Sequence, residues 1–456
     1  MPSTTIQIGA QGLPILTFIK GATYWVFLWN AIGGTFDAWS SPDAATWGLA
    51  ATGPRSPGWG FGSGGYNLQD GGAAFFDGDH TVTLAYQSYD SLYYFGDNFL
   101  IDFDLNAGTW GAPYADQTFS GFTGHSVAPA FIFRLSSGNI AVIYQDTRTY
   151  QVPFGYKPAP FMIQAWDGSS WTALVDICAG AEALPDFAPL TAKFQFCTAV
   201  LDSADVVHAI YWASDASVPD WNNPRFFYQE ILPDGTLQNF QEFPGQTGAQ
   251  PDLHGAALVA QGGTLLEVLY QTPGPNLYIL GGKLFWGIWR YDYVNSISYV
   301  SVYIGSPIIN PVWTELGNLD PTAVDGDAEA APIFVVDPIS GQFYMSFLSN
   351  DTGVTAAVTT DGFATFSNLD ISDTVAGTPQ VNFFAPFLLF GPLYAITGGI
   401  ISEGGTIPVS ITSFSGPAPV VPSIKITFRG VKRTRCAPEG PEYANMPTAP
   451  SVKRAM

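Results

Sequence analysis

The sequence is short of charge, of basic residues in particular, and of cysteine. Lys and Arg together number 16 against 38 Asp and Glu, which gives a net charge of −22 at pH 7. An acidic chain repels nucleic acid and anionic membranes at long range, so we expect no nucleic-acid binding and no membrane insertion. The three cysteines, Cys178, Cys197 and Cys436, are an odd number without the spacing of a disulfide framework. Disulfides are therefore not expected to hold the fold together.

Several familiar signatures are absent as well. There is no P-loop, no H-E-x-x-H pair and no G-x-S-x-G elbow, so nucleotide, zinc-protease and α/β-hydrolase chemistry lack sequence support. The N-terminal MPSTTIQIGAQGLP has neither the basic nor the apolar region of a secretory signal. The uncharged stretch Phe383–Ile401 is long enough to suggest a membrane span. It contains Pro386 and Pro392 and matches the repeat described next, so it predicts two buried strands instead.

What the sequence does contain is a repeated strand–turn–strand unit. Ala128–Gln145, APAFIFRLSSGNIAVIYQ, predicts a strand at Pro129–Phe133, a Ser-Ser-Gly turn and a second strand at Ile140–Tyr144. Six further stretches share this shape, and they start at Leu13, Ala73, Cys197, Ala256, Ala331 and Ala385. Successive units start a few tens of residues apart, and a recurrence of this kind indicates a repeat architecture.

Each unit continues into a third and a fourth strand, which turns such as Asp167-Gly168 and Asp234-Gly235 join. A four-stranded sheet with two apolar faces needs a neighbour on each side, so such units pack around an axis. The sequence thus predicts an all-β fold with almost no helix, a seven-bladed β-propeller of four-stranded antiparallel blades over residues 1–430. Six blades are the alternative, if the first and last units share one blade. Either Ile424–Arg429 or the N-terminal Thr4–Ile8 is expected to close the ring.

Turns between strands resemble the Asp-box of sialidase-like β-propellers, S-x-D-x-G-x-T-W. The resemblance is carried by Thr359–Phe366, Ser41–Trp47, Asp167–Trp171 and Asn106–Trp110. The Asp of such a turn can accept backbone N–H bonds across it, while the aromatic ring packs between sheets. The resemblance implies the fold, and in that superfamily the box is structural rather than catalytic.

The same resemblance gives a standard for activity. A sialidase would need three clustered arginines, a Tyr–Glu nucleophile pair and an Asp that acts as the acid. Only six arginines precede the tail: Arg55, Arg134, Arg148, Arg225, Arg290 and Arg429. Gly138–Arg148 is similar to a sialidase strand, but APAF stands where F-R-I-P is expected and Arg134 lies downstream. The missing cluster favours binding over hydrolysis, and a glycosidase with paired carboxylates is the alternative.

Position in the predicted propeller suggests a binding site. The innermost strand of each blade begins at one mouth of the central channel, so the residues just before these strands form a ring there. They are Gln11, Asp70, His125, Gln195, His254, Glu329 and Asn382. All can form hydrogen bonds, and with Trp and Tyr faces nearby they suit a sugar. The alternative interpretation is that strand entries are simply polar.

Three smaller features have competing interpretations. Asp325, Asp327 and Glu329 offer carboxylates to calcium, although an ordinary acidic turn explains them as well; no other cofactor is expected. Asp77–His80 is expected to be a hairpin turn. His208 lies within a predicted strand and is expected to be a packed, hydrogen-bonded residue rather than a ligand.

The C-terminal segment 431–456 has a different composition. It contains five basic and two acidic residues, so it carries +3 against −25 for residues 1–430. Four prolines and no alternating apolar run predict an extended tail. We expect Lys432, Arg433 and Arg435 to anchor the propeller to other subunits of a larger assembly, the alternative being a tail that lies on its own propeller.

These features favour a non-enzymatic structural or adhesive propeller on a particle or cell surface, such as a virion decoration, fibre or receptor-binding protein. It would bind glycans or a protein partner and be extracellular or on a virion surface. The alternative is a sialidase-like glycoside hydrolase acting on extracellular glycans.

Overall fold

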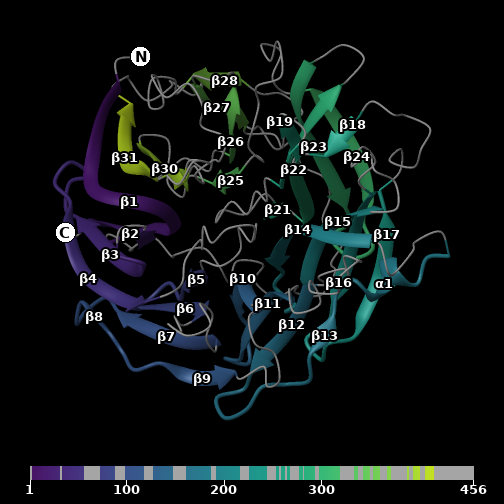
Figure 1. The fold of residues 1–456 in the computed structure, drawn as a ribbon, viewed down its shortest axis with the longest axis horizontal. Helices are drawn as coiled ribbons and strands as arrows, with labels where there is room; N and C mark the ends of the chain where they lie inside the picture. The colour runs from purple at the N-terminus through teal and green to yellow at the C-terminus, as the bar shows by residue number, and fades with distance from the viewer. Residues whose placement is uncertain are drawn as a thin grey trace, which may run out of the picture.

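A computed structural model shows an all-β molecule in which sheets surround a central axis (Figure 1). The structure describes residues 3–30, 33–55, 72–87, 98–117, 127–146, 161–185, 192–215, 225–243, 253–255, 258–261, 264–267, 277–280, 282–292, 297–318, 333–336, 343–349, 353–359, 367–370, 388–389, 394–400 and 406–414. Among these the only helix is α1 (Ala179–Glu182). No helix in these ranges is long and apolar enough to cross a membrane.

The first four blades are antiparallel sheets of strands that follow one another in the sequence. Blade one contains the second half of β1 (Ser3–Lys20), β2 (Thr23–Asn30), β3 (Thr35–Ser41) and β4 (Gly48–Arg55). Blade two contains β5 (Ala73–Phe76), β6 (Thr81–Gln87), β7 (Asn98–Asp104), β8 (Thr109–Trp110) and β9 (Tyr114–Gln117). Blade three contains β10 (Val127–Arg134), β11 (Ile140–Asp146), β12 (Phe161–Trp166) and β13 (Val175–Asp176). Blade four contains β14 (Ala192–Leu201), β15 (Val207–Asp215), β16 (Arg225–Ile231) and β17 (Leu237–Glu242).

The later sheets follow the same order. Blade five contains β18 (Leu253–Gly255), β21 (Leu277–Leu280), β22 (Lys283–Asp292), β23 (Ile297–Ser306) and β24 (Val312–Asn318). The next sheet contains β25 (Ile333–Val336), β26 (Phe343–Ser349), β27 (Gly353–Thr359) and β28 (Ser367–Asp370). The last contains β29 (Leu388–Leu389), β30 (Tyr394–Ile400) and β31 (Thr406–Phe414). β29 and β30 fall in the uncharged stretch Phe383–Ile401, where the sequence predicts two strands.

Blade five corrects one part of the sequence prediction. The repeat copy at Ala256 does form a hairpin, β19 (Leu258–Gln261) with β20 (Thr264–Glu267), but this pair is a separate two-stranded sheet. The place beside β22 is taken by β21 along its first residues and by β18 along its last. The apolar pattern identified a hairpin correctly, but it does not specify which sheet the hairpin joins, because that depends on pairing distant in sequence.

The N-terminal strand closes the ring. Ser3–Gln7 of β1 pairs antiparallel with Ser410–Phe414 of β31, and Gly12–Lys20 pairs with β2, so one strand serves the last sheet and the first. This confirms the N-terminal alternative; Ile424–Arg429 lies outside the described residues.

The inner strands run around the axis in sequence order. β1, β5, β10, β14, β21, β25 and β29 each lie beside the next, and β29 lies beside β1. The fold is a β-propeller, as predicted, and this cycle supports seven blades, although the blade count stays a prediction.

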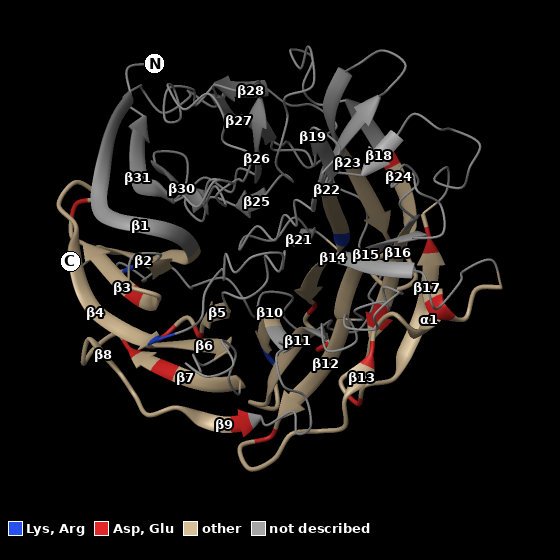
Figure 2. Ribbon diagram, viewed as in Figure 1, with Lys and Arg blue, Asp and Glu red and all other residues tan. Residues whose placement is uncertain are grey.

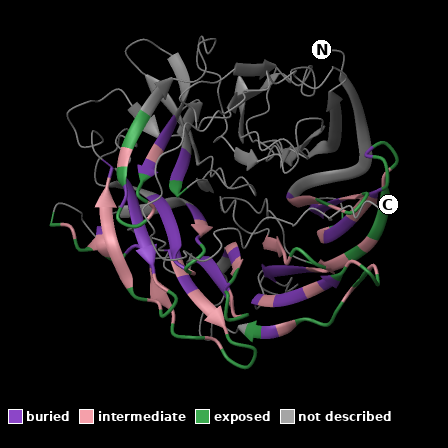
Figure 3. Ribbon diagram, turned by 180° about the vertical axis from the view of Figure 1, so that it is seen from behind, coloured by how far each residue is buried: buried purple, intermediate pink, exposed green. Residues whose placement is uncertain are grey.

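The core lies between blades rather than inside any one sheet. β2, TYWVFLWN, is buried almost throughout because both of its faces meet other elements, which explains its unbroken apolar run. Between blades one and two, the ring of Phe27 packs edge-on against Phe103 at 5.3 Å and Trp110 at 6.0 Å. Full burial of such a side chain contributes roughly 1.5–3 kcal/mol. Figure 3 shows the buried residues along the middle strands and the exposed ones in the connections and on outer strands such as β4.

Candidate functional site

The two ends of the blades differ in their connections. At one end, which we call the turn face, the first strand turns into the second and the third into the fourth through short segments such as Gly21–Ala22 and Leu105–Gly108. At the other end, the loop face, the second strand leads to the third and each blade to the next. Segments there are as long as residues 56–72 and 147–160. Functional residues concentrate on such loops, so the loop face is the candidate site.

Three residues of the predicted channel-mouth ring lie in described strands. Gln11 pairs with Pro408, Gln195 with Trp212 and His254 with Tyr291. Gln11 and Gln195 lie on inner strands near their loop-face ends, and His254 lies on β18, which pairs with the loop-face end of β22. The ring itself stays a prediction. Asp70, His125, Glu329 and Asn382 lie outside the described residues.

The inner strands carry β-bulges close to this end, a feature the sequence analysis did not find. In the ladders with the second strands, the register skips Ile15 in β1, Ala130 in β10 and Phe196 in β14. A bulge leaves a residue unpaired and bends the strand, and bulges often lie beside binding sites where they redirect side chains. Three inner strands therefore bend at a similar distance from the loop face.

Polar side chains are buried at the loop-face ends of blades one and two. Gln87 and Asn98 pair across β6 and β7, and both are almost inaccessible to solvent. In blade one, Asp37 accepts hydrogen bonds from Asn30 Nδ2 at 2.7 Å and Thr35 Oγ1 at 2.9 Å. Burial raises the pKa of the Asp37 carboxyl, and the two hydrogen bonds only partly offset that effect. Asp37 is thus a buried carboxyl with a raised pKa close to the candidate site.

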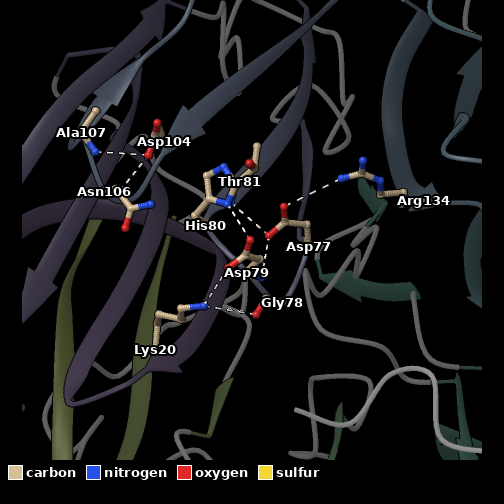
Figure 4. Close-up of polar contacts among 10 residues, drawn as sticks. All are labelled: Lys20, Asp77, Gly78, Asp79, His80, Thr81, Asp104, Asn106, Ala107 and Arg134. Atoms are coloured by element: carbon tan, nitrogen blue, oxygen red, sulfur yellow. Dashed lines mark hydrogen bonds and ion pairs between the residues drawn. The ribbon is translucent and has the colours of Figure 1, made fainter. Parts of the chain in front are cut away.

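The turn face holds a polar network that joins neighbouring blades (Figure 4). Lys20 of blade one lies 3.5 Å from Asp79 of blade two, whose own turn is held by Asp77. Arg134 of blade three lies 3.9 Å from Asp77. The hydrogen bond with Asp79 raises the pKa of His80 and lowers that of Asp79. Lys20, Asp79, His80 and Arg134 are exposed, so solvent screens these pairs and the network aligns turns without forming an enclosed site.

The four turns between third and fourth strands in blades one to four follow the expected chemistry. Asp43 accepts the backbone N–H groups of Ala45 at 2.9 Å and Thr46 at 2.6 Å. Asp167 accepts those of Ser169 and Ser170, which lowers its pKa to about 2.

In blade two the acceptor is Asp104, which lies two residues before the segment singled out from the sequence. Asp234 accepts the N–H of Thr236 in blade four. The predicted hydrogen bonds are therefore present at Asp43 and Asp167, while Thr360–Phe366 lies outside the described residues and the family resemblance stays a prediction.

Charge and metal ligands give no further site in the described part of the chain. Acidic residues are more frequent than basic ones along the described blades (Figure 2). No group of three or more His, Cys, Asp or Glu there is arranged to hold a metal ion. Asp325, Asp327 and Glu329, the predicted calcium ligands, lie outside the described residues, as do the tail residues Lys432, Arg433 and Arg435.

Comparison with known proteins found no matching family model and no matching curated protein. Among solved structures, an α-L-arabinofuranosidase from Fusarium graminearum is similar, with 11% identity, 90% of this chain and 97% of that chain covered and a TM-score of 0.43. A Penicillium chrysogenum α-L-arabinanase has 13% identity, 73% and 89% coverage and a TM-score of 0.40. The SapL1 lectin, in complex with α-methyl fucoside, has 12% identity, 82% and 99% coverage and a TM-score of 0.39. At these values no residue role is transferred to this chain.

Proposed function

We propose that this chain is a glycan-directed propeller whose ligand binds at the loop face. The observation that carries the proposal is strand register: Gln11 of β1, Gln195 of β14 and His254 of β18 lie at the loop-face ends of their strands, and β1 and β14 have bulges near that end. Amide and imidazole groups can bind sugar hydroxyls, and aromatic rings can stack on sugar faces.

A matched pair of histidines tests the location. His254→Ala on the loop face should weaken binding of arabinobiose or α-methyl fucoside, two sugars bound in similar solved structures, whereas His80→Ala on the turn face should not. Isothermal titration calorimetry measures both. Equal affinities in the two variants, with both proteins folded, would remove the loop-face site.

One observation favours glycoside cleavage over binding alone. A general acid for this reaction is a carboxyl with a raised pKa, and burial raises the pKa of the Asp37 carboxyl, which lies near the loop-face end of blade one. Cleavage needs a second carboxylate, for which the sequence offers Asp70 and Glu329 in the predicted ring.

The test of cleavage is sugar release from arabinan, followed by reducing-end detection. Asp37→Asn should lower the rate by roughly a hundredfold or more while binding persists, as expected for loss of a general acid. Binding without sugar release in the unaltered protein would instead establish a lectin-like adhesive module.

Display on a virion, particle or cell surface, an extracellular location and anchoring to other subunits through residues 431–456 stay proposals from the sequence. The charge difference between tail and body supports the anchoring.

A further inference from the structure

The surface of blade four that faces blade five contains a buried chain of polar side chains. Alternation along β15 and β16 directs Ala209, Tyr211 and Phe227 toward the core shared with blade three. The residues between them face the other way, where Phe226 packs on Trp286 of blade five at 5.2 Å. His208 and Glu230, directly opposite each other in the ladder, lie on this second face and are fully buried.

Four side chains are hydrogen-bonded one after another in this network. His208 Nε2 lies 3.3 Å from Asp202 Oδ2, and His208 Nδ1 lies 2.6 Å from the Tyr228 hydroxyl. The Tyr228 hydroxyl lies 2.9 Å from Glu230 Oε1. The ring of Tyr228 also packs edge-on against Trp313 of blade five at 5.4 Å.

The two carboxyl groups at the ends of this network, Asp202 and Glu230, both accept hydrogen bonds from backbone or side-chain amide groups. Asp202 Oδ1 accepts the N–H groups of Ala204 and Val206, each at 2.8 Å. Burial raises the pKa of Asp202, but the hydrogen bonds from His208 and Val206 outweigh it and the pKa is lowered. Glu230 accepts Gln238 Nε2 at 3.0 Å and Asn239 Nδ2 at 2.7 Å.

The direction of one hydrogen bond determines that of the next. The Tyr228 hydroxyl donates to Glu230 Oε1, so the Tyr228 oxygen accepts from His208 Nδ1. The other ring nitrogen, Nε2, faces Asp202 Oδ2.

Glu230 also reaches into blade five. Its Oε1 accepts the backbone N–H of Asn310 at 2.7 Å, in the turn between β23 and β24. The corresponding turns of blades one to four each contain their own acceptor, Asp43, Asp104, Asp167 or Asp234. The blade-five turn, Pro307–Pro311, contains no acidic residue.

We propose that the Asp202–His208–Tyr228–Glu230 chain caps the blade-five turn from the neighbouring blade. His208 donates from Nδ1 to the Tyr228 oxygen, and Tyr228 donates to Glu230, so the position of Glu230 is fixed through both side chains. Glu230 then supplies the carboxylate that this turn lacks, which ties blade five to blade four.

The proposed capping of the blade-five turn by Glu230 can be tested by amide hydrogen exchange at Asn310 in the whole protein. Tyr228→Phe keeps the ring against Trp313 but removes the hydroxyl that donates to Glu230 Oε1 and helps to hold it in place. Asn310 exchange should therefore become faster, by roughly tenfold, if the position of Glu230 depends on this hydrogen bond. Tyr86→Phe, at a buried tyrosine of blade two, should leave it unchanged. Unchanged Asn310 exchange in Tyr228→Phe would overturn the proposal.

Two further measurements keep the proposal testable if Tyr228→Phe does not fold. With ¹⁵N-labelled histidine, of which the sequence has four, Nδ1 of His208 should be protonated, and an unprotonated Nδ1 would contradict the donor assignment. Ile308→Asp places an acceptor two residues before Asn310, as Asp234 precedes Thr236. Combined with Glu230→Gln, it should restore slow exchange, and failure to do so would count against turn capping as the role of Glu230.

Discussion

Close packing between blades depends on single residues in the outer strands. A Cβ atom on Gly53 of β4 would lie 2.2 Å from the Phe36 carbonyl oxygen and 2.7 Å from Trp110 Cε2. Both are tightly held, so neither can move away at low cost. Gly53 is therefore where the edge of blade one meets Trp110 of blade two.

We predict that Gly53→Ala lowers the free energy of unfolding by about 1–3 kcal/mol, the usual cost of overpacking a core. A Cβ atom on Gly48, in the same strand, would meet no neighbouring side chain or backbone within 4 Å, so Gly48→Ala is the matched control. Denaturant unfolding of the two variants measures the difference. Equal stabilities would show that blades one and two can separate without cost.

Because its pKa is raised, Asp37 is expected to contribute to stability in a way that depends on pH. The folded state binds the Asp37 proton more tightly than the unfolded state does. The stabilising contribution of Asp37 is therefore fully present at a pH below 3.8, the ordinary pKa of an Asp carboxyl. It is lost as the pH rises through the folded pKa. Asp37→Asn should therefore be as stable as or more stable than the unaltered protein at pH 7, with the advantage vanishing in acid. Thermal unfolding between pH 3 and pH 7 measures it, and a variant less stable at pH 7 would contradict the assignment.

Among the elements, the turn at Asp167 shows the opposite dependence. The N–H groups of Ser170 and Ser169 lower the Asp167 pKa to about 2, so its stabilising contribution is present above 3.8 and is lost as the pH falls toward about 2. Asp167→Ala should lower the thermal midpoint at pH 7 and remove this part of the acid dependence. Asp167→Asn, which keeps an acceptor oxygen without a charge, should lose less at pH 7 and lack the same slope. A midpoint unaffected by Asp167→Ala would show that the turn forms without its carboxylate.

The strands and hairpins also show how much of the fold can be predicted from the sequence alone. Runs such as TYWVFLWN predicted strands correctly because a strand buried on both faces has few polar residues. The hairpin β19–β20 was found, but its sheet was not, because sheet membership depends on pairing between distant residues. His208 was expected to be packed and hydrogen-bonded, and it is. Its link to Glu230 required the register of β15 with β16, which neither residue's neighbours in the sequence specify.

At the scale of the whole molecule, the pairing of β1 with β31 joins the two ends of the ring. Deleting residues 1–11 removes the part of β1 that pairs with β31 and leaves Gly12–Lys20 in blade one. We expect a clearly lower denaturant midpoint, because the last sheet loses a strand and the ring loses its closure. Deleting residues 431–456 is the control and should leave a folded, soluble propeller. Equal midpoints for the two deletions would mean that the pairing contributes little.

The strand β1 also imposes an order on biosynthesis. Its first half is synthesised before the other described strands of the propeller, yet its partner β31 is synthesised after all of them. Throughout translation Ser3–Gln7 therefore presents an unpaired edge, the kind of surface at which chains aggregate or exchange strands. Polar residues are well represented there, with Ser3, Thr4, Thr5 and Gln7 beside Ile6. A nascent propeller with this arrangement depends on keeping its first strand soluble until its last sheet exists.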